Sequence, residues 1–146
     1  MKTEEIRNTL ISVHGNRDIP RKIRLSKTKI HNAVSANRRR CKDVGLECSL
    51  THASVEQDFL LSYGTLCKYC GTQMTLKNMA YDHIRALARG FGSFPENMQW
   101  ICKKCNTRKG PLDDEEYRAF IQFIGGLSEM SRSYIFHKMS QRTKYA

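Results

Sequence analysis

The sequence has no run of apolar residues long enough to cross a membrane, for which about 18 are needed. Its first segment, MKTEEIRNTLIS, also lacks the continuous apolar core of a secretion signal. We therefore expect no membrane-spanning segment and no export, and we place the protein in a reducing cytoplasm. There the six cysteines are expected to bind metal or pack as thiols rather than form disulfides.

Acidic residues are also few. The 146 residues contain 14 Asp and Glu against 25 Lys and Arg, which gives a formal net charge of +11. Such an excess attracts polyanions, so nucleic acid is the first candidate partner and an anionic membrane surface the second. The length fits one domain with added arms or helices, but not two independent cores.

The positive charge is concentrated near the N-terminus. Between residues 17 and 42 the sequence has ten basic residues and one acid. Gly15 and Pro20 predict a loop at the start of this segment. The stretch from Ser26, a candidate N-cap, to Gly45 then predicts a helix whose exposed surface is largely basic. No helix is predicted before it.

Downstream, the hydrophobic patterns predict short helices around two strands. Helices are expected within 50–64, 102–110, 111–126 and 127–141, and strands within 79–84 and 98–101. Two glycines and a proline predict a loop at 85–97. The fold class is therefore α+β, with helices flanking a small central unit.

Four of the cysteines form two Cys-x-x-Cys pairs, a spacing typical of zinc sites. The expected ligands are Cys67, Cys70, Cys102 and Cys105. Two such turns can place four thiolates tetrahedrally around one structural Zn²⁺. Cys41 and Cys48 are spaced differently, and we interpret them as packed thiols.

Polar residues between and after the cysteine pairs suggest a second metal site. Asp82 and His83 are adjacent in a predicted strand, so their side chains should point to opposite faces unless a bulge or twist intervenes. Asn106 directly follows Cys105 at the start of a predicted helix. The zinc would fix this helix against the strand, so that Asp82 and Asn106 share a hard cation such as Mg²⁺ or Mn²⁺.

In their order along the chain, these residues resemble the HNH endonuclease family in its zinc-stabilised ββα-metal form. The resemblance is carried by the cysteine pairs, Asp82-His83-Ile84, Asn97-x-x-Trp100, Asn106 and Lys109-Gly110. The resemblance extends over residues 45–124, and within the family the sequence is similar to small phage proteins. The resemblance implies a nuclease domain at 45–124. The basic arm and helix at 1–44, an expected DNA contact, and the C-terminal helix at 125–146 lie outside it.

The resemblance also implies a role for each motif residue. His83 corresponds to the general base, and Asp82 and Asn106 to the ligands of one catalytic Mg²⁺ or Mn²⁺. Asn97 corresponds to the residue that shapes the loop and orients the histidine. The implied reaction is hydrolysis of double-stranded DNA to 5′-phosphate and 3′-hydroxyl ends, in a bacterial or phage-infected cell.

Basic residues on both sides of the motif are the expected DNA contacts. They are Arg21, Lys22, Arg24, Lys27, Arg38, Arg39, Arg40, Arg85, Arg108 and Lys109. The loop RALARGFGSFPE departs from the polar or Gly-Gly stretch of many members, so its contacts with substrate do not carry over. The alternative is a catalytically silent zinc module that binds nucleic acid or a protein, and it would not need the complete set of Asp82, His83 and Asn106.

Overall fold

The computed structural model describes residues 2–141, and within them it confirms an α+β fold. The α-helices are α1 (Thr3–His14), α2 (Ile19–Val44), α3 (His52–Ser62), α4 (Lys103–Lys109), α5 (Asp114–Gly125) and α6 (Glu129–Ser140). The strands are β1 (Met79–His83) and β2 (Met98–Cys102), and the loop between them contains two short 3₁₀ turns, Leu87–Arg89 and Pro95–Asn97. No helix within 2–141 combines the length and apolar character that a bilayer span requires.

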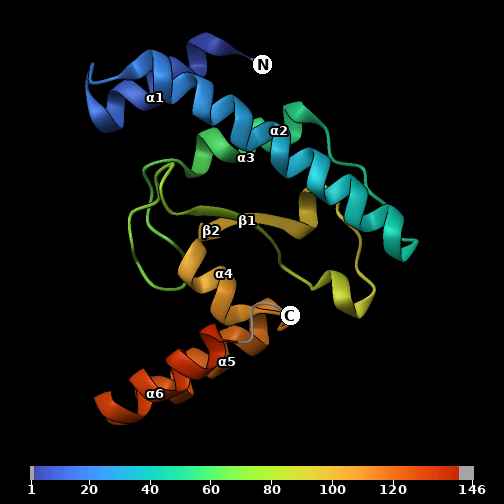
Figure 1. Cartoon of the computed structure of the whole chain (residues 1–146), viewed down its shortest axis with the longest axis vertical. Coiled ribbons are helices and arrows are strands. Elements are labelled where there is room, and N and C mark those ends of the chain that lie inside the picture. The colour runs from blue at the N-terminus through green and yellow to red at the C-terminus, as the bar shows by residue number, and fades with distance from the viewer. Residues whose placement is uncertain (1, 142–146) are drawn as a thin grey trace.

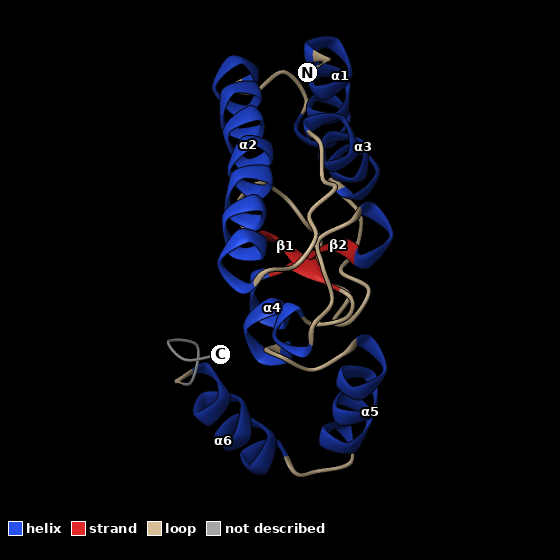
Figure 2. Ribbon diagram, turned by 90° about the vertical axis from the view of Figure 1, so that its right-hand side faces the viewer, coloured by secondary structure: helices blue, strands red, loops and turns tan. Residues whose placement is uncertain are grey.

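The two strands lie at the middle of the molecule. Helices α1, α2 and α3 pack together at one end, and α5 and α6 lie at the other (Figures 1 and 2). Helix α4 follows β2 directly and packs against both strands. The central unit is thus a β-hairpin followed by a helix, which agrees with the predicted ββα core.

The strands pair antiparallel over five residues each. Asp82 lies opposite Gln99, and His83 lies opposite Met98. The pairing runs without an inserted residue, so of the two expected devices, a bulge or a twist, the bulge is absent from this ladder. His83 is the last paired residue of β1, and the pocket described below lies at this end of the hairpin, where side chains of successive residues can reach it.

One hydrophobic cluster joins the N-terminal helices to the strands. Ile30 and Val34 of α2 belong to the same buried cluster as Phe59 of α3 and Trp100 and Ile101 of β2. The Phe59 and Trp100 rings meet edge to face with centroids 5.6 Å apart. Burial of such side chains contributes roughly 1.5–3 kcal/mol each. The apolar packing therefore crosses the predicted domain boundary at residue 44.

Two expectations about the N-terminal segment were wrong. Helix α1 was not predicted, although Ile6 and Leu10, one helical turn apart, are both fully buried. Helix α2 begins at Ile19 rather than at Ser26. Pro20 occupies the first turn, where a missing N–H costs nothing. Ser26 lies inside the helix, and its hydroxyl donates to the Lys22 carbonyl at 2.8 Å.

The loop between the strands is attached to the segment that follows α2. The Ser93 N–H donates to the Glu47 carbonyl, and the Ser49 N–H donates to the Ser93 carbonyl, both at 2.9 Å. This close approach requires glycine next to Ser93. A Cβ atom on Gly92 would lie 2.4 Å from the Glu47 carbonyl oxygen.

We therefore expect Gly92→Ala to lower the free energy of unfolding by about 1–3 kcal/mol, the usual cost of overpacking. Gly125→Ala is the matched control, because a Cβ atom there meets no heavy atom within 4 Å. The control should leave stability unchanged or raise it by up to about 1 kcal/mol. Urea denaturation of the three proteins measures both effects, and equal stability of the two variants would contradict the steric explanation.

Candidate active site

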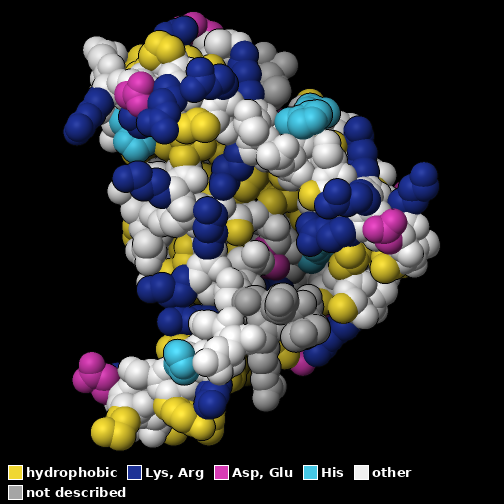
Figure 3. Space-filling view, in the orientation of Figure 1, with side chains coloured by type: hydrophobic (Ala, Val, Ile, Leu, Met, Phe, Trp, Pro, Cys, Tyr) yellow, Lys and Arg dark blue, Asp and Glu magenta, His cyan; other side chains and the backbone are white. Residues whose placement is uncertain are grey.

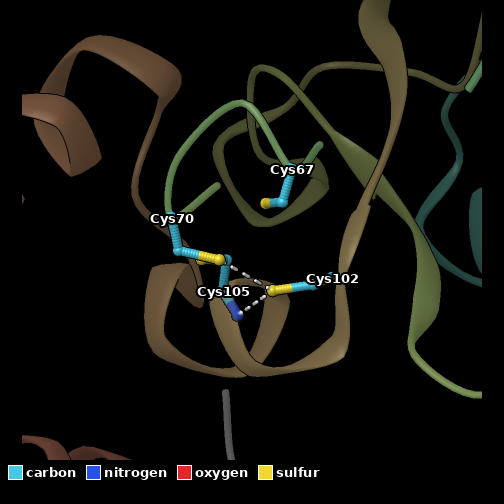
Figure 4. Close-up of side chains that lie close together, drawn as sticks. All are labelled: Cys67, Cys70, Cys102 and Cys105. Atoms are coloured by element: carbon cyan, nitrogen blue, oxygen red, sulfur yellow. Dashed lines mark hydrogen bonds between the residues drawn. The ribbon is translucent and has the colours of Figure 1, made fainter. Parts of the chain in front are cut away.

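The four cysteines of the two pairs converge on one point (Figure 4). Cys67 and Cys70 come from the turn after α3, whereas Cys102 ends β2 and Cys105 lies in α4. Their sulfur atoms all lie within 4.8 Å of one another. Tetrahedral zinc thiolates, with Zn–S bonds of about 2.3 Å, have sulfur atoms at similar separations. The cluster therefore fits a structural metal ion, as predicted.

Hydrogen bonds prepare one of the thiols for ionisation. Burial opposes ionisation of Cys70, but hydrogen bonds with Thr72 and the neighbouring thiols outweigh it and lower its pKa to about 6. Burial raises the pKa of Cys102 and Cys105 above the ordinary thiol value. A bound dication removes this obstacle, because it is the thiolate that ligates. Outside the cluster, Cys41 is buried and Cys48 half-buried.

A separate pocket of about 570 Å³ contains the predicted catalytic residues. Asp82, His83 and Asn106 all line it, although Asn106 belongs to a different element from the other two. Arg40, near the end of α2, lines it as well. The structure thus brings together the three side chains that the sequence assigned to the reaction, and it adds an arginine from the N-terminal helix.

Two hydrogen-bond donors hold the Asp82 carboxylate. Its Oδ2 atom accepts hydrogen bonds from Gln99 Nε2 at 2.9 Å and from Lys109 Nζ at 3.1 Å. Burial raises the pKa of this carboxyl, and the contacts with Gln99 and Lys109 act in the opposite direction. Both partners therefore favour the ionised form that a hard cation binds.

Lys109 lies in the interior and not at the surface, where it was predicted. It was expected to contact a DNA phosphate, but its side chain is fully buried. Its ammonium group donates to the His83 carbonyl oxygen at 2.7 Å in addition to pairing with Asp82. The lysine thus links α4 to the end of β1 and is not available at the surface.

His83 is buried, and one of its ring nitrogens is already bound. Its Nε2 atom lies 2.7 Å from the Ser93 hydroxyl oxygen. Burial, together with the positive charges of Arg40 and Lys109, lowers the pKa of His83 to about 4. The imidazole is therefore neutral near pH 7, which is the protonation state a general base requires.

Asn97 fixes the loop, and among the described residues no hydrogen bond joins its side chain to the His83 ring. Its Oδ1 atom accepts from the Arg85 N–H at 2.9 Å, and its Nδ2 atom donates to the Arg85 and Gly92 carbonyls, each at 3.0 Å. These contacts fit the predicted loop-shaping role. In residues 2–141 the hydrogen-bond partner of the His83 ring is Ser93, a residue that the sequence analysis did not single out.

Asn106 lines the same pocket as Asp82. It follows Cys105 in α4 and is half-buried. Among the described residues, no hydrogen bond holds its side chain. An amide oxygen and a carboxylate oxygen are suitable donors for Mg²⁺ or Mn²⁺. The residues present therefore fit the predicted catalytic metal.

Most of the other predicted DNA contacts are accessible. Arg21, Arg24, Arg38, Arg39, Arg40 and Arg85 are exposed, and Lys22, Lys27 and Arg108 are half-buried. Lys and Arg side chains follow the course of α2 across the face shown in Figure 3. Arg108 points elsewhere, since its guanidinium stacks on the Phe136 ring of α6 at 3.6 Å.

A comparison with known families agrees with this geometry. Residues 67–120 match the model of a family described as HNH endonuclease. Over this segment, which is less than half of the chain, the protein is similar to HNH endonucleases. The matched segment contains both cysteine pairs, the strands and α4, whereas α1, α2, α3 and α6 lie outside it. No curated protein matches the chain.

The residues that hold the candidate catalytic side chains in place could be predicted only in part from the sequence. Gln99 could have been predicted, because pairing the two predicted strands places a residue of the second strand, Gln99, opposite Asp82. Ser93 lay in a loop of unpredicted shape, and its neighbours come from α2. No local pattern reports such a contact between residues far apart in the chain.

We expect Cys67→Ser to lose the bound metal and to unfold the hairpin unit, because structural zinc in small modules supplies about 10–16 kcal/mol of apparent folding free energy. Cys48→Ser is the matched control, since Cys48 lies outside the cluster. Metal analysis should find one zinc per chain in the wild type and control but none in Cys67→Ser, together with a large drop in Tm. Retention of zinc by Cys67→Ser would contradict the assignment.

Proposed function

We propose that this protein is a metal-dependent endonuclease that hydrolyses phosphodiester bonds of double-stranded DNA to 5′-phosphate and 3′-hydroxyl ends. The observation that carries the proposal is the convergence of Asp82, His83 and Asn106 on one pocket inside an HNH domain. A protein that only binds nucleic acid would have no need for a buried, neutral imidazole beside a pair of oxygen ligands.

In the proposed reaction, His83 removes a proton from a water molecule that attacks the phosphorus in line with the leaving oxygen. The lowered pKa keeps the ring neutral near pH 7, so that a ring nitrogen has a free lone pair for that proton. A Mg²⁺ or Mn²⁺ ion bound by Asp82 and Asn106 would supply positive charge to the phosphate and the leaving 3′ oxygen. Lys109 and Gln99 hold the Asp82 carboxylate in its orientation.

We expect His83→Ala to remain folded and to lower the cleavage rate by about 10²–10⁴-fold, the usual contribution of a general base. His52→Ala is the matched control, because His52 begins α3 and lies outside the pocket. Plasmid nicking with Mg²⁺ or Mn²⁺ measures both, and a chelator should abolish cleavage by the wild type. Equal cleavage by wild type and His83→Ala would exclude the mechanism, and no cleavage by any of the proteins would favour a silent binding module.

Helix α2 is the proposed surface for the DNA backbone. Three pairs of basic residues on it are spaced by 18 residues, which is five helical turns, so the members of each pair lie on the same side. They are Arg21 with Arg39, Lys22 with Arg40, and Arg24 with Lys42. At 1.5 Å per residue the two sets lie about 27 Å apart, the length of about eight base pairs. Because Arg40 also lines the pocket, a duplex along α2 would reach the site.

We expect Arg39→Gln to weaken duplex binding and to reduce the slope of log K against log salt by about 0.9, the value for one lost phosphate contact. Lys138→Gln on α6 removes the same charge from an exposed position away from α2 and should leave the slope unchanged. The His83→Ala background prevents cleavage during the titration. Identical slopes for the two variants would contradict DNA binding along α2.

A further inference from the structure

The Ser93 side chain lies at the centre of a buried polar cluster next to the candidate base. Ser93 is completely buried, and its hydroxyl oxygen contacts three side chains. These are His83 Nε2 at 2.7 Å, Cys41 Sγ at 3.1 Å and Asn37 Oδ1 at 3.2 Å. Cys41 and Asn37 both come from α2, outside the segment that matches the HNH family.

The orientation of the Asn37 amide is set by the helix itself. Asn37 is buried, and its Nδ2 atom donates to the Ala33 carbonyl one turn earlier at 2.8 Å. Its Oδ1 atom therefore faces the opposite way, toward Ser93, and also accepts from Arg40 Nη2 at 3.2 Å. An amide oxygen can only accept, and the Ser93 hydroxyl donates its single proton to this oxygen.

This use of the hydroxyl proton decides the state of the histidine. With its proton given to Asn37, the Ser93 oxygen can only accept from the His83 ring. The Nε2 atom of neutral His83 must then carry the proton, and Nδ1 is left with its lone pair. The Cys41 thiol also donates to the Ser93 oxygen and does not compete for the proton.

We propose that Ser93 and Asn37 are positioning residues that hold neutral His83 in the tautomer protonated at Nε2, so that Nδ1 is the proton acceptor in catalysis. The catalytic part of this inference rests on the proposed nuclease function, whereas the tautomer is a property of the protein alone. Helix α2 would then have two roles, since it contacts the DNA backbone and fixes the state of the base.

The tautomer is measured directly by two-bond ¹H–¹⁵N correlation spectra of the full chain with its zinc, at mildly alkaline pH. The spectrum of His83→Ala identifies the His83 signals among the five histidines. We expect a single Nε2-protonated form in the wild type and a mixture of tautomers in Ser93→Ala and Asn37→Leu. Asn37→Asp loses the donation to the Ala33 carbonyl and with it some stability, but it should keep the wild-type tautomer, because a carboxylate oxygen in nearly the same position still accepts from Ser93.

Cys41→Ala is the control for damage to the buried cluster, since it removes another contact of Ser93 but not the acceptor. It should retain the wild-type tautomer even if it is less stable. In cleavage assays Ser93→Ala and Asn37→Leu should lower kcat by about 10²-fold with little change in KM, as misplacement of a catalytic group does, while Asn37→Asp retains activity. If Ser93→Ala does not fold, the comparison of Asn37→Leu with Asn37→Asp still decides the question.

Either of two results would overturn the inference: an unchanged tautomer in Asn37→Leu, or an equal disturbance in Cys41→Ala. A wild-type protein that shows the Nε2-protonated form but cuts no DNA would refute the proposed function and leave the tautomer assignment standing. A wild type that cuts DNA with a mixed tautomer would do the reverse.

Discussion

The structure depends on one constraint, the attachment of two distant turns to the same group of four sulfur atoms. Cys67 and Cys70 lie before the hairpin, and Cys102 and Cys105 lie at its end, so a bound metal closes the hairpin unit like a crosslink. Asn106 is the next residue after Cys105, and its position relative to β1 follows from this closure. A metal ion bound by the four cysteines would thus also place Asn106, one of the two oxygen ligands that we propose for the catalytic metal.

A chain of hydrogen bonds leads from the metal-binding turn to the other ligand. Tyr69, between the two cysteines of the first pair, accepts from Gln99 at 3.0 Å, and the same Gln99 amide holds Asp82. The Tyr69 hydroxyl in turn donates to Asp114 in the first turn of α5. The Gln99 amide nitrogen thus bridges the Tyr69 hydroxyl and the Asp82 carboxylate, whereas the Oε1 atom of Gln99 is buried without a hydrogen-bond partner among the described residues. The Asp82 carboxylate is therefore oriented by groups that the sulfur cluster itself positions.

The sequence was sufficient for the features that depend on local patterns. Cysteine spacing predicted the cluster, and the local hydrophobic patterns predicted both strands. Pro20 was misread because proline breaks a helix interior but is favoured in a first turn. Lys109 was misread because its burial depends on Asp82, which lies 27 positions earlier and approaches it only after folding.

The contribution of α2 to the site has a consequence for how the domain works. A family match that begins at Cys67 contains the motif residues, yet the hydroxyl that binds His83 is held by Asn37 and Cys41 of a helix that ends before the match begins. In the proposed mechanism, the ββα unit would supply the reacting groups, and α2 would supply the environment that fixes their state. Because Arg40 lines the pocket and donates to Asn37, contact of Arg40 with a phosphate would act on the same network that orients the proposed base. Substrate binding and preparation of the base would then be joined through one turn of α2.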